Sequence, residues 1–458
     1  LAAGILRIIH VFLLPIFGTK HVITISTIIK LIPVIGIGFA VMDPHTPFWV
    51  FMILAFTTGF GGGDFSSYMP STSLFFPKRL KGTALGIQAG IGNFGVSVVQ
   101  FITPLILGVA TYGAASVFTS IDTKEAITVF KNASIDTKTK IFSALDAELQ
   151  VKILSNVKPF KIDSVAAAIQ NTNETQILIN LPAKVQAKAI SAINPKAAAK
   201  IMNAFEDNSS SVVSKEIYIQ SAAFWYAPLL IILAIICWFF LQSVPITASF
   251  KEQLDIFSNK HTWFCTLTYL MTFGTFAGLA AAFPLMIKIL YGDFPNAPDP
   301  LVYAFYGPLI GSASRVLFGF IADKVGGAIL TTLTGIGIIS GVGIIIAFDL
   351  VSPTSMEQFP LFVAVMLGIF FFTGMGNAGT FRQYPIIFSH NQRQAAGVIG
   401  WTAAIAAFGP FLFATLIGNN ITANGSANQF FIGLLLFSIV ATLVNWWYYN
   451  RKNCEKPS

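Results

Sequence analysis

Long apolar stretches recur along the chain and are separated by short polar segments. Those long enough to cross a lipid bilayer as helices are residues 1–18, 22–42, 47–76, 84–111, 218–243, 262–291, 301–322, 327–348, 360–388, 394–418 and 428–449. Backbone polar groups inside a bilayer must bond within their own segment, which favours helices over strands. The pattern therefore predicts an all-α polytopic membrane protein with about eleven transmembrane helices.

The polar segments between these stretches alternate in charge. Every second loop carries Lys or Arg, and the loops between them carry neither. The basic set comprises Lys20; Lys78, Arg79 and Lys81; Lys251 and Lys260; Lys324; Arg393; and Arg451, Lys452 and Lys456. Basic loops face the cytoplasm, so we predict a cytoplasmic tail at 451–458. Residue 1 would then start at the outer face, already helical, and we expect the chain to lack the first of twelve helices.

Composition agrees with this class. Hydrophobic residues make up 54% of the chain and charged residues 10%, against roughly 25% charged in soluble domains. The net charge of +8 follows from the basic loops, so it does not indicate nucleic-acid binding. The three cysteines and five histidines have no metal or redox spacing. We expect no enzyme activity, no cofactor and no metal.

A polar segment at 112–217 interrupts the pattern on the predicted outer side, which would place it in the periplasm. It contains an internal repeat, because LDAELQVKILSNVKP at 145–159 aligns with LPAKVQAKAISAINP at 181–195. Repeats of this period are typical of stacked helical hairpins. The segment resembles the helical repeats in soluble domains of some magnesium transporters and motor proteins. We favour a solvated insert without a role in transport.

Two arginines, Arg7 and Arg315, lie inside apolar stretches of the two halves of the chain. Guanidinium stays protonated, and a charge at membrane depth usually faces a bundle interior or a water-filled cavity. Its planar fork matches planar oxyanions. The pair is typical of a clamp for a small anion. The alternative is that each arginine pairs with a carboxylate or reaches the membrane surface.

Residues 59–100 form the most distinctive segment, with two apolar stretches joined by the basic turn FFPKRLKG. Gly82, Gly86 and Gly90 recur every four residues, and Gly92 and Gly95 continue the strip. Such a strip lets a second helix approach closely. Asn93 adds an uncharged donor at the same depth. Taken alone, the glycines favour plain helix packing.

The chain resembles the nitrate/nitrite porter family of the major facilitator superfamily. The resemblance rests on GGGDFSSYM at 61–69, GNFGVSV at 92–98, GIFFFTGMGNAGTFRQYPIIF at 368–388 and GVIGWTAAIAAFGPF at 397–411. It implies two half bundles. We expect an N-terminal half at 1–111 and 218–243, an insert at 112–217, a cytoplasmic linker at 244–261, a C-terminal half at 262–450 and a tail at 451–458.

The resemblance also implies roles for individual residues. The substrate-binding residues would be Arg7, Arg315, Phe65, Asn93, Tyr269 and Phe273. The glycines that serve helix packing and conformational change would be Gly86, Gly90, Gly92, Gly400 and Gly409. Asp323 and Lys324 would form a cytoplasmic gate. Tyr269 and Phe273 are four residues apart and so share a helical face. For each aromatic residue, packing or lipid contact is the alternative.

Asp64 departs from the family pattern, which commonly has Asn before the Phe. A buried carboxyl can carry a coupling proton. Alternatively, Asp64 pairs with Lys30 or with Arg7. We favour structural pairing slightly over proton coupling.

The expected function is exchange of nitrate and nitrite by alternating access of two halves around a central site. Alternatives are nitrate–proton symport, exchange of other small anions such as oxalate and formate, and a nitrate sensor that uses the insert to bind a partner. Expected partners are nitrate, nitrite and the lipid bilayer of a bacterial inner membrane. We expect a monomer without nucleic-acid partners.

Overall fold

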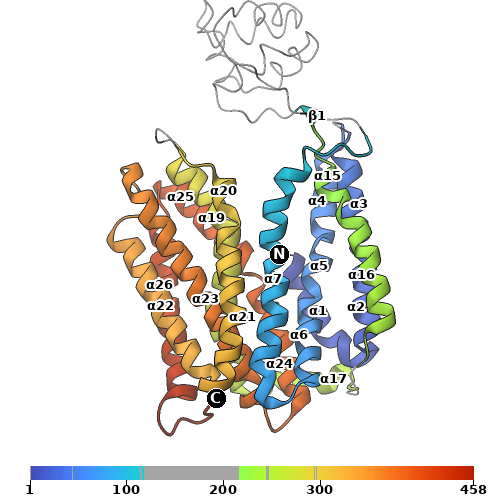
Figure 1. Cartoon of the computed structure of the whole chain (residues 1–458). Helices are drawn as coiled ribbons and strands as arrows, with labels where there is room; N and C mark the ends of the chain where they lie inside the picture. Colours follow the sequence, from blue (N-terminus) through green and yellow to red (C-terminus); the bar gives the residue numbers. More distant parts are fainter. Residues whose placement is uncertain are drawn as a thin grey trace, which may run out of the picture. The chain divides into compact units, whose positions relative to one another are not determined.

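The structure is a computed structural model that describes residues 2–43, 45–113, 116–117, 216–243, 247–292, 294 and 297–458. Packing divides the chain into two units. One comprises Leu1–Leu105 with Ala222–Ser458, and the other is Ile106–Ser221. The sequence repeat at 145–195 lies outside the described residues. Figure 1 shows the helices of the first unit.

The helices match the predicted apolar stretches. Across the described part of the chain, ten helical spans are long and apolar enough to cross a membrane, and Ala2–Phe17 is a shorter apolar helix. The predicted all-α class is confirmed. The described strands are two residues long, β1 (Ser116–Val117) and β2 (Glu216–Ile217), which pair antiparallel.

The N-terminal half is built from interrupted helices. Its elements are α1 (Ala2–Phe17), α2 (Thr19–Ile29), α3 (Leu31–Ala40), α4 (Phe48–Thr57), α5 (Gly59–Gly63), α6 (Phe65–Phe75), η1 (Lys78–Leu80), α7 (Lys81–Ile106), α15 (Ser221–Phe224) and α16 (Tyr226–Phe240). Gly18 separates α1 from α2 with a φ of 81°, a conformation that glycine adopts without steric cost. Lys30 and Asp64 each stand at a helix junction.

Long helices are more frequent in the C-terminal half. Its elements are α18 (Lys260–Tyr269), η4 (Leu270–Gly274), α19 (Thr275–Tyr291), α20 (Pro300–Ala304), α21 (Tyr306–Val325), α22 (Gly327–Ala347), η5 (Met356–Gln358), α23 (Phe359–Ile387), α24 (Gln392–Ala406), α25 (Gly409–Asn424), α26 (Asn428–Asn445) and η6 (Trp446–Asn450). Both η4 and η6 are π-helical. The main buried apolar cluster lies largely in this half.

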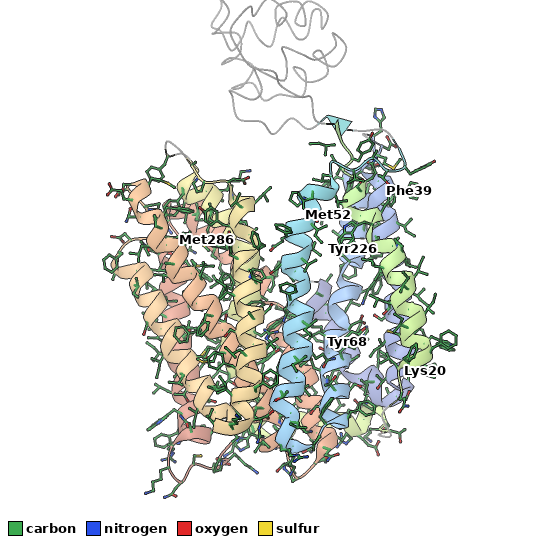
Figure 2. All side chains as sticks on the ribbon, in the orientation of Figure 1. Lys20, Phe39, Met52, Tyr68, Tyr226 and Met286 are labelled. Atoms are coloured by element: carbon green, nitrogen blue, oxygen red, sulfur yellow. The ribbon has the colours of Figure 1, made fainter. Side chains whose placement is uncertain are left out.

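A short linker joins the halves. It contains α17 (Phe250–Gln253) and η3 (Leu254–Ser258), and it lies at the same end of the bundle as the C-terminus (Figure 1). We call this end the linker end. In Figure 2 Lys20 lies near the linker end and Phe39 near the opposite end. The halves meet where α24 packs against α1 and α6 and where the glycines of α7 face α21.

Candidate functional site

Arg7 lies on α1 and points between the halves. Its side chain donates from Nε to the Gly62 carbonyl at 2.7 Å and from Nη1 to the Ala403 carbonyl of α24 at 3.0 Å. The residue is 9% exposed, and it forms no ion pair with any carboxylate of the described residues. Two backbone carbonyls therefore hold the guanidinium in place and leave its positive charge uncompensated.

Arg315 on α21 is completely buried. Its Nη1 donates to the Ala89 carbonyl of α7 at 3.2 Å, whereas Nε and Nη2 have no partner within the described ranges. A buried donor left unpaired costs free energy, and more so when it is charged. Arg315 is therefore a buried cation whose Nε and Nη2 groups could bind a negatively charged acceptor.

One aromatic ring connects the two arginines. The ring centroid of Phe273 lies 5.4 Å from Cζ of Arg7 and 5.5 Å from Cζ of Arg315. Phe65 stacks on Phe273 at 5.6 Å between centroids and lies 4.8 Å from Arg7 Cζ. Rings at these distances attract guanidinium groups through their negative faces. The structure thus brings Arg7, Arg315, Phe65 and Phe273 together.

A π-helical turn shapes this aromatic group. Tyr269 ends α18 and Phe273 lies in the following π turn, η4, and their rings stack 5.4 Å apart. The expected shared face is thereby observed, although the π turn itself was not predicted. Such turns often occur at functional sites. The Tyr269 hydroxyl is buried without a hydrogen-bond partner among described residues, so it is available to a ligand.

Asn93 lies on α7 one turn beyond Ala89, whose carbonyl receives Arg315. The residue is half-buried, and its Nδ2 is unpaired within the described part of the protein. Residues four apart share a helix face. Asn93 therefore lies on the same side of α7 as the contact with Arg315, and its free donor suits an anion.

The predicted glycines fall into two groups. A Cβ added at Gly86 would lie 3.0 Å from Gly319 Cα, and one at Gly400 would lie 3.0 Å from the Ser66 carbonyl. A Cβ at Gly90 would clash with Val316 Cγ2, and one at Gly409 would lie 2.5 Å from the Gly274 carbonyl. Gly92 differs, because it is exposed and a Cβ there would meet nothing within 4 Å. Gly92 therefore makes no close helix contact here, and its conformational role stays a prediction.

Asp64 is 2% exposed and pairs with Lys30, not with Arg7. Its second oxygen accepts a hydrogen bond from Ser26. Of the alternatives open from sequence, the structure thus contains the Lys30 pair. Because Lys30 pairs with the carboxylate, Asp64 forms no ion pair with Arg7 or Arg315.

The halves also meet at the linker end. Asp323 on α21 accepts hydrogen bonds from the backbone N–H groups of Gly82 at 2.9 Å and Thr83 at 2.7 Å, at the start of α7. Arg382 on α23 lies 3.0 Å from the same carboxylate. A carboxylate at a helix N-terminus is favoured by the helix dipole. Lys324, predicted as part of this gate, is exposed and forms no ion pair with described residues.

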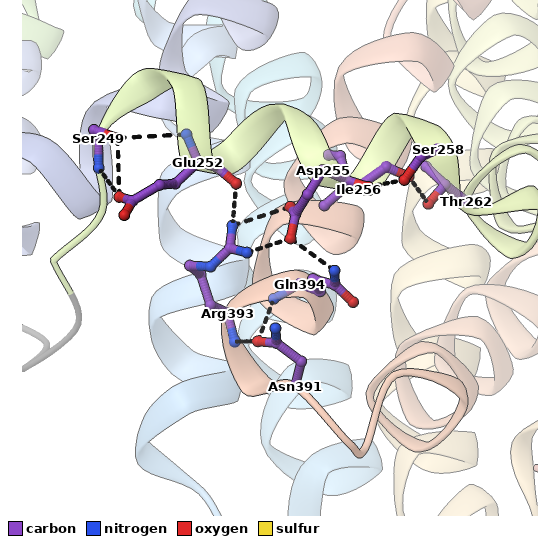
Figure 3. A network of polar contacts seen from close by, with 9 residues as sticks. All are labelled: Ser249, Glu252, Asp255, Ile256, Ser258, Thr262, Asn391, Arg393 and Gln394. Carbon is purple, nitrogen blue, oxygen red and sulfur yellow. Dashed lines mark hydrogen bonds and ion pairs between the residues drawn. The ribbon is translucent and has the colours of Figure 1, made fainter.

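The linker forms a second contact set there, shown in Figure 3. Arg393 at the start of α24 forms a two-pronged ion pair with Asp255, which also accepts from Gln394 at 2.7 Å. Burial acts to raise the pKa of Asp255, but these hydrogen bonds outweigh it and lower that pKa below its usual value. Gln253 donates to the Phe12 carbonyl of α1 at 3.2 Å, so the linker contacts both halves.

Some residues of the site were not predicted from the sequence. Phe276 lies 5.2 Å from Cζ of Arg315, and the Phe381 ring packs 5.4 Å from that of Tyr269. Asn377 is fully buried, with its Oδ1 unpaired among the described residues. Asn377 and Phe381 belong to the segment GNAGTF, so the motif itself was the signal. The carbonyls of Gly62, Ala89 and Ala403 could not be found from side-chain identity.

The arrangement suits binding rather than bond chemistry. Two guanidinium groups supply positive charge, and aromatic faces exclude water around them. Within the described residues no cluster of His, Cys, Asp or Glu could hold a metal ion. The physical fit is to a small, flat, negatively charged ligand. The Nε and Nη2 groups of Arg315, unpaired among the described residues, would hold its edge, and Arg7 adds a second positive charge.

Solved structures with the same fold are membrane transporters. The fucose–proton symporter of Escherichia coli aligns over 97% of this chain and 88% of its own, with 12% identity and a TM-score of 0.59. A proton–xylose symporter aligns over 99% of this chain and 86% of its own, with 14% identity and a TM-score of 0.51. The fold is that of the major facilitator superfamily.

Sequence relatives are more specific. A protein of Thermus thermophilus named probable nitrate/nitrite antiporter NarK2 is 45% identical over 457 residues, covering 100% of this chain and 83% of the relative. The nitrate/nitrite transporter NarU of Escherichia coli K12 is 27% identical over 98% of this chain and 81% of its own. The chain belongs to the nitrate/nitrite porter family, and the predicted resemblance is confirmed.

The insert has its own match. Residues 110–206 match the family described as MgtE intracellular N domain. This agrees with the resemblance of the repeat to soluble domains of magnesium transporters. Most of the matched segment lies outside the described residues.

Proposed function

We propose that this protein exchanges nitrate for nitrite across a membrane by alternating access. The observation that carries the proposal is the buried Arg315, whose Nε and Nη2 lack partners among described residues, together with Arg7 across the ring of Phe273. The name of the Thermus thermophilus relative supports this substrate pair. Nitrate and nitrite are flat and singly charged, as the site requires.

In this proposal the bound anion lies among aromatic faces and receives hydrogen bonds from both arginines. Phe65 and Phe273 supply the faces, and Tyr269 and Asn93 supply further free donors. A planar oxyanion accepts two parallel N–H bonds from one guanidinium, which adds geometric selectivity to charge. These six residues form the proposed substrate site.

The same charges explain exchange rather than uniport. An empty site would carry two uncompensated guanidinium groups through a region of low dielectric, which is unfavourable. A bound anion reduces that charge, so the loaded carrier reorients more readily than the empty one. One-for-one exchange of monovalent anions moves no net charge, and the proposal therefore needs no proton.

The two halves would rock about this site. We place the linker end at the cytoplasm because the basic loops gather there, and the contacts of Asp323 and Asp255 would then close the cytoplasmic side. Lys324 stays a proposed member of that gate. We further propose that the protein is a monomer in a bacterial inner membrane and that its insert lies on the outer side. The insert matches a domain family described as intracellular, whereas this proposal places it outside. The side of the membrane on which the insert lies therefore tests the proposed orientation.

Counterflow in proteoliposomes tests the proposal. Vesicles holding the purified protein are loaded with nitrite, labelled nitrate is added outside, and uptake is followed with and without an inward proton gradient. We expect uptake that requires internal nitrite and ignores the gradient. Uptake into empty vesicles that follows the proton gradient would instead establish symport, and binding without counterflow would indicate a sensor.

A further inference from the structure

The N-terminal half contains one carboxylate at membrane depth. Among residues 1–113 the acidic residues are Asp43, in a loop, and Asp64. Asp64 stands at the junction of α5 and α6, next to the site residue Phe65, and is 2% exposed. A buried carboxylate is unfavourable unless it is paired and hydrogen-bonded.

Both oxygens of Asp64 have partners from the same segment of chain. Ser26 donates to Oδ1, and the Lys30 ammonium pairs with Oδ2. Lys30 sits where α2 ends and α3 begins, so the break in the helix places its side chain beside α5. The side chain is 19% exposed. Together Lys30 and Asp64 form a neutral pair, and neither carries a free charge into the site.

Arg7 lies close to this pair without joining it. Its Nε bonds the carbonyl of Gly62, two residues before Asp64. His10, one turn further along α1, has its Nδ1 3.9 Å from Asp64 Oδ1 and 3.2 Å from the Ser67 hydroxyl. The face of α1 that presents Arg7 therefore also faces the carboxylate. Without a competing cation, Coulomb attraction in the low dielectric of the bundle would draw Asp64 and Arg7 together.

We propose that Lys30 is a positioning residue that compensates Asp64 and so keeps Arg7 available to the transported anion. The role is electrostatic, since Lys30 itself does not touch the proposed substrate site. The inference rests on the proposed function and deepens it, because it explains how an acid can lie beside an anion site without occupying it.

A charge series tests the proposal by the KM for nitrate in nitrite-loaded vesicles. Lys30→Met frees the carboxylate, and we expect KM to rise at least about 10-fold. Asp64→Asn frees the ammonium instead, so KM should fall about threefold. The double variant Lys30→Met with Asp64→Asn restores neutrality, and its KM should return to that of the wild type.

Lys20→Met is the matched control. Lys20 lies on the same helix, α2, and its Nζ is 4.7 Å from the ring centroid of Trp238. This substitution removes the same charge without touching Asp64, and we expect KM to stay unchanged. Lys30→Arg, which keeps the charge, should also behave as the wild type.

The order of KM values decides the outcome. If Lys30→Met fails to fold, the comparison of Asp64→Asn with the double variant still applies, because only the first has an extra positive charge. Equal KM values in those two, or a double variant as impaired as Lys30→Met, would overturn the proposal. A wild-type protein that shows no exchange would defeat the proposed function instead.

Discussion

Two groups of buried charged residues, Asp64 with Lys30 and Arg7 with Arg315, lie side by side in the bundle and differ in whether their charge is paired. Asp64 has a cation on one oxygen and a hydroxyl on the other. Among the described residues, Arg7 and Arg315 have no ion pair, and their hydrogen bonds go to backbone carbonyls beside aromatic rings. Burying a charge is costly in both places. In the first group the protein compensates the charge itself.

The difference locates the ligand. A group that is fully paired in the protein has no binding capacity left, whereas Arg315 and Tyr269, which both contact the ring of Phe273, keep donors that are unpaired among the described residues. Because these donors form no hydrogen bond within the protein, they can form hydrogen bonds to a ligand and so contribute to its binding free energy. A buried charged residue that is paired within the protein therefore has a structural role, and one without a charged partner is a candidate for ligand binding. The partners of the residue, and not its type, make this distinction.

The largest effect is expected from removing the uncompensated charge. Arg315→Gln should lower nitrate exchange by roughly 100-fold or more, because hydrogen bonds to a charged group contribute about 1.5–3 kcal/mol each. Initial rates of labelled nitrate uptake measure it, with thermal melting of the purified protein as the check on folding. Arg315→Lys keeps the charge but loses the fork and should recover only part of the rate. A folded Arg315→Gln protein at near wild-type rate would exclude the anion site.

The aromatic face between the arginines should matter next. Phe273→Ala removes a ring lying over both guanidinium groups, and about 0.5–2 kcal/mol per contact corresponds to a roughly 10-fold rise in KM. Phe320→Ala serves as control, because Phe320 is 48% exposed on α21. Equal KM values for the two variants would mean that Phe273 only fills space.

A smaller effect is expected where the halves touch without charge. Gly86→Ala places a methyl group 3.0 Å from Gly319 Cα and 3.1 Å from the Arg315 carbonyl, and such overpacking costs about 1–3 kcal/mol. We expect the exchange rate to fall several-fold with KM little changed. Gly92→Ala on the same helix adds the same methyl into open space and should be silent. A reversed order of the two rates would contradict the observed contact of α7 with α21.

The smallest effect is expected at the compensated pair of the linker end. Asp255→Asn breaks its ion pair with Arg393, and partly exposed pairs contribute about 0–1 kcal/mol. The hydrogen bonds to Asp255 outweigh its burial, and the pKa of this carboxyl is lowered. Its stabilising effect is present above the ordinary pKa of an aspartate and is lost as pH falls through the lowered value.

The linker contact should therefore be independent of pH between about pH 5 and pH 8. Exchange rates of wild type and Asp255→Asn, measured across that range, should differ by at most a few-fold and by a constant factor. A ratio that changes with pH would mean that another titrating group controls this contact.

The sequence predicted the helices well because bilayer-spanning apolar stretches are long and unambiguous. It also identified Arg7 and Arg315, since charge inside an apolar stretch stands out. The roles of Phe65, Phe273 and Tyr269 came only from the family motif, because aromatic residues are abundant in this chain. The structure adds that Phe273 contacts both arginines and that Phe65 contacts Arg7.

Other features depended on three-dimensional placement. Pro33, in the first turn of α3, marks the helix break at Lys30, because it cannot donate to the carbonyl of Ile29. The placement of the Lys30 ammonium beside Asp64, however, is not visible in the sequence. The π turn at 270–274 is likewise invisible in the hydrophobic pattern. Gly92 continues a regular glycine strip, yet the crossing of α7 and α21 uses only its earlier members. The four-residue spacing of the glycines indicates that they share a helix face, but it does not show how far along that face the neighbouring helix makes contact.

Efflux of labelled nitrate from preloaded vesicles tests the central claim most directly. The claim is that the uncompensated pair Arg7 and Arg315 must carry an anion in order to reorient. We predict that label stays inside when the outer medium holds only an impermeant anion, and that it leaves once nitrite is added outside. Equal efflux in both media would show that the empty carrier returns freely and would contradict the account.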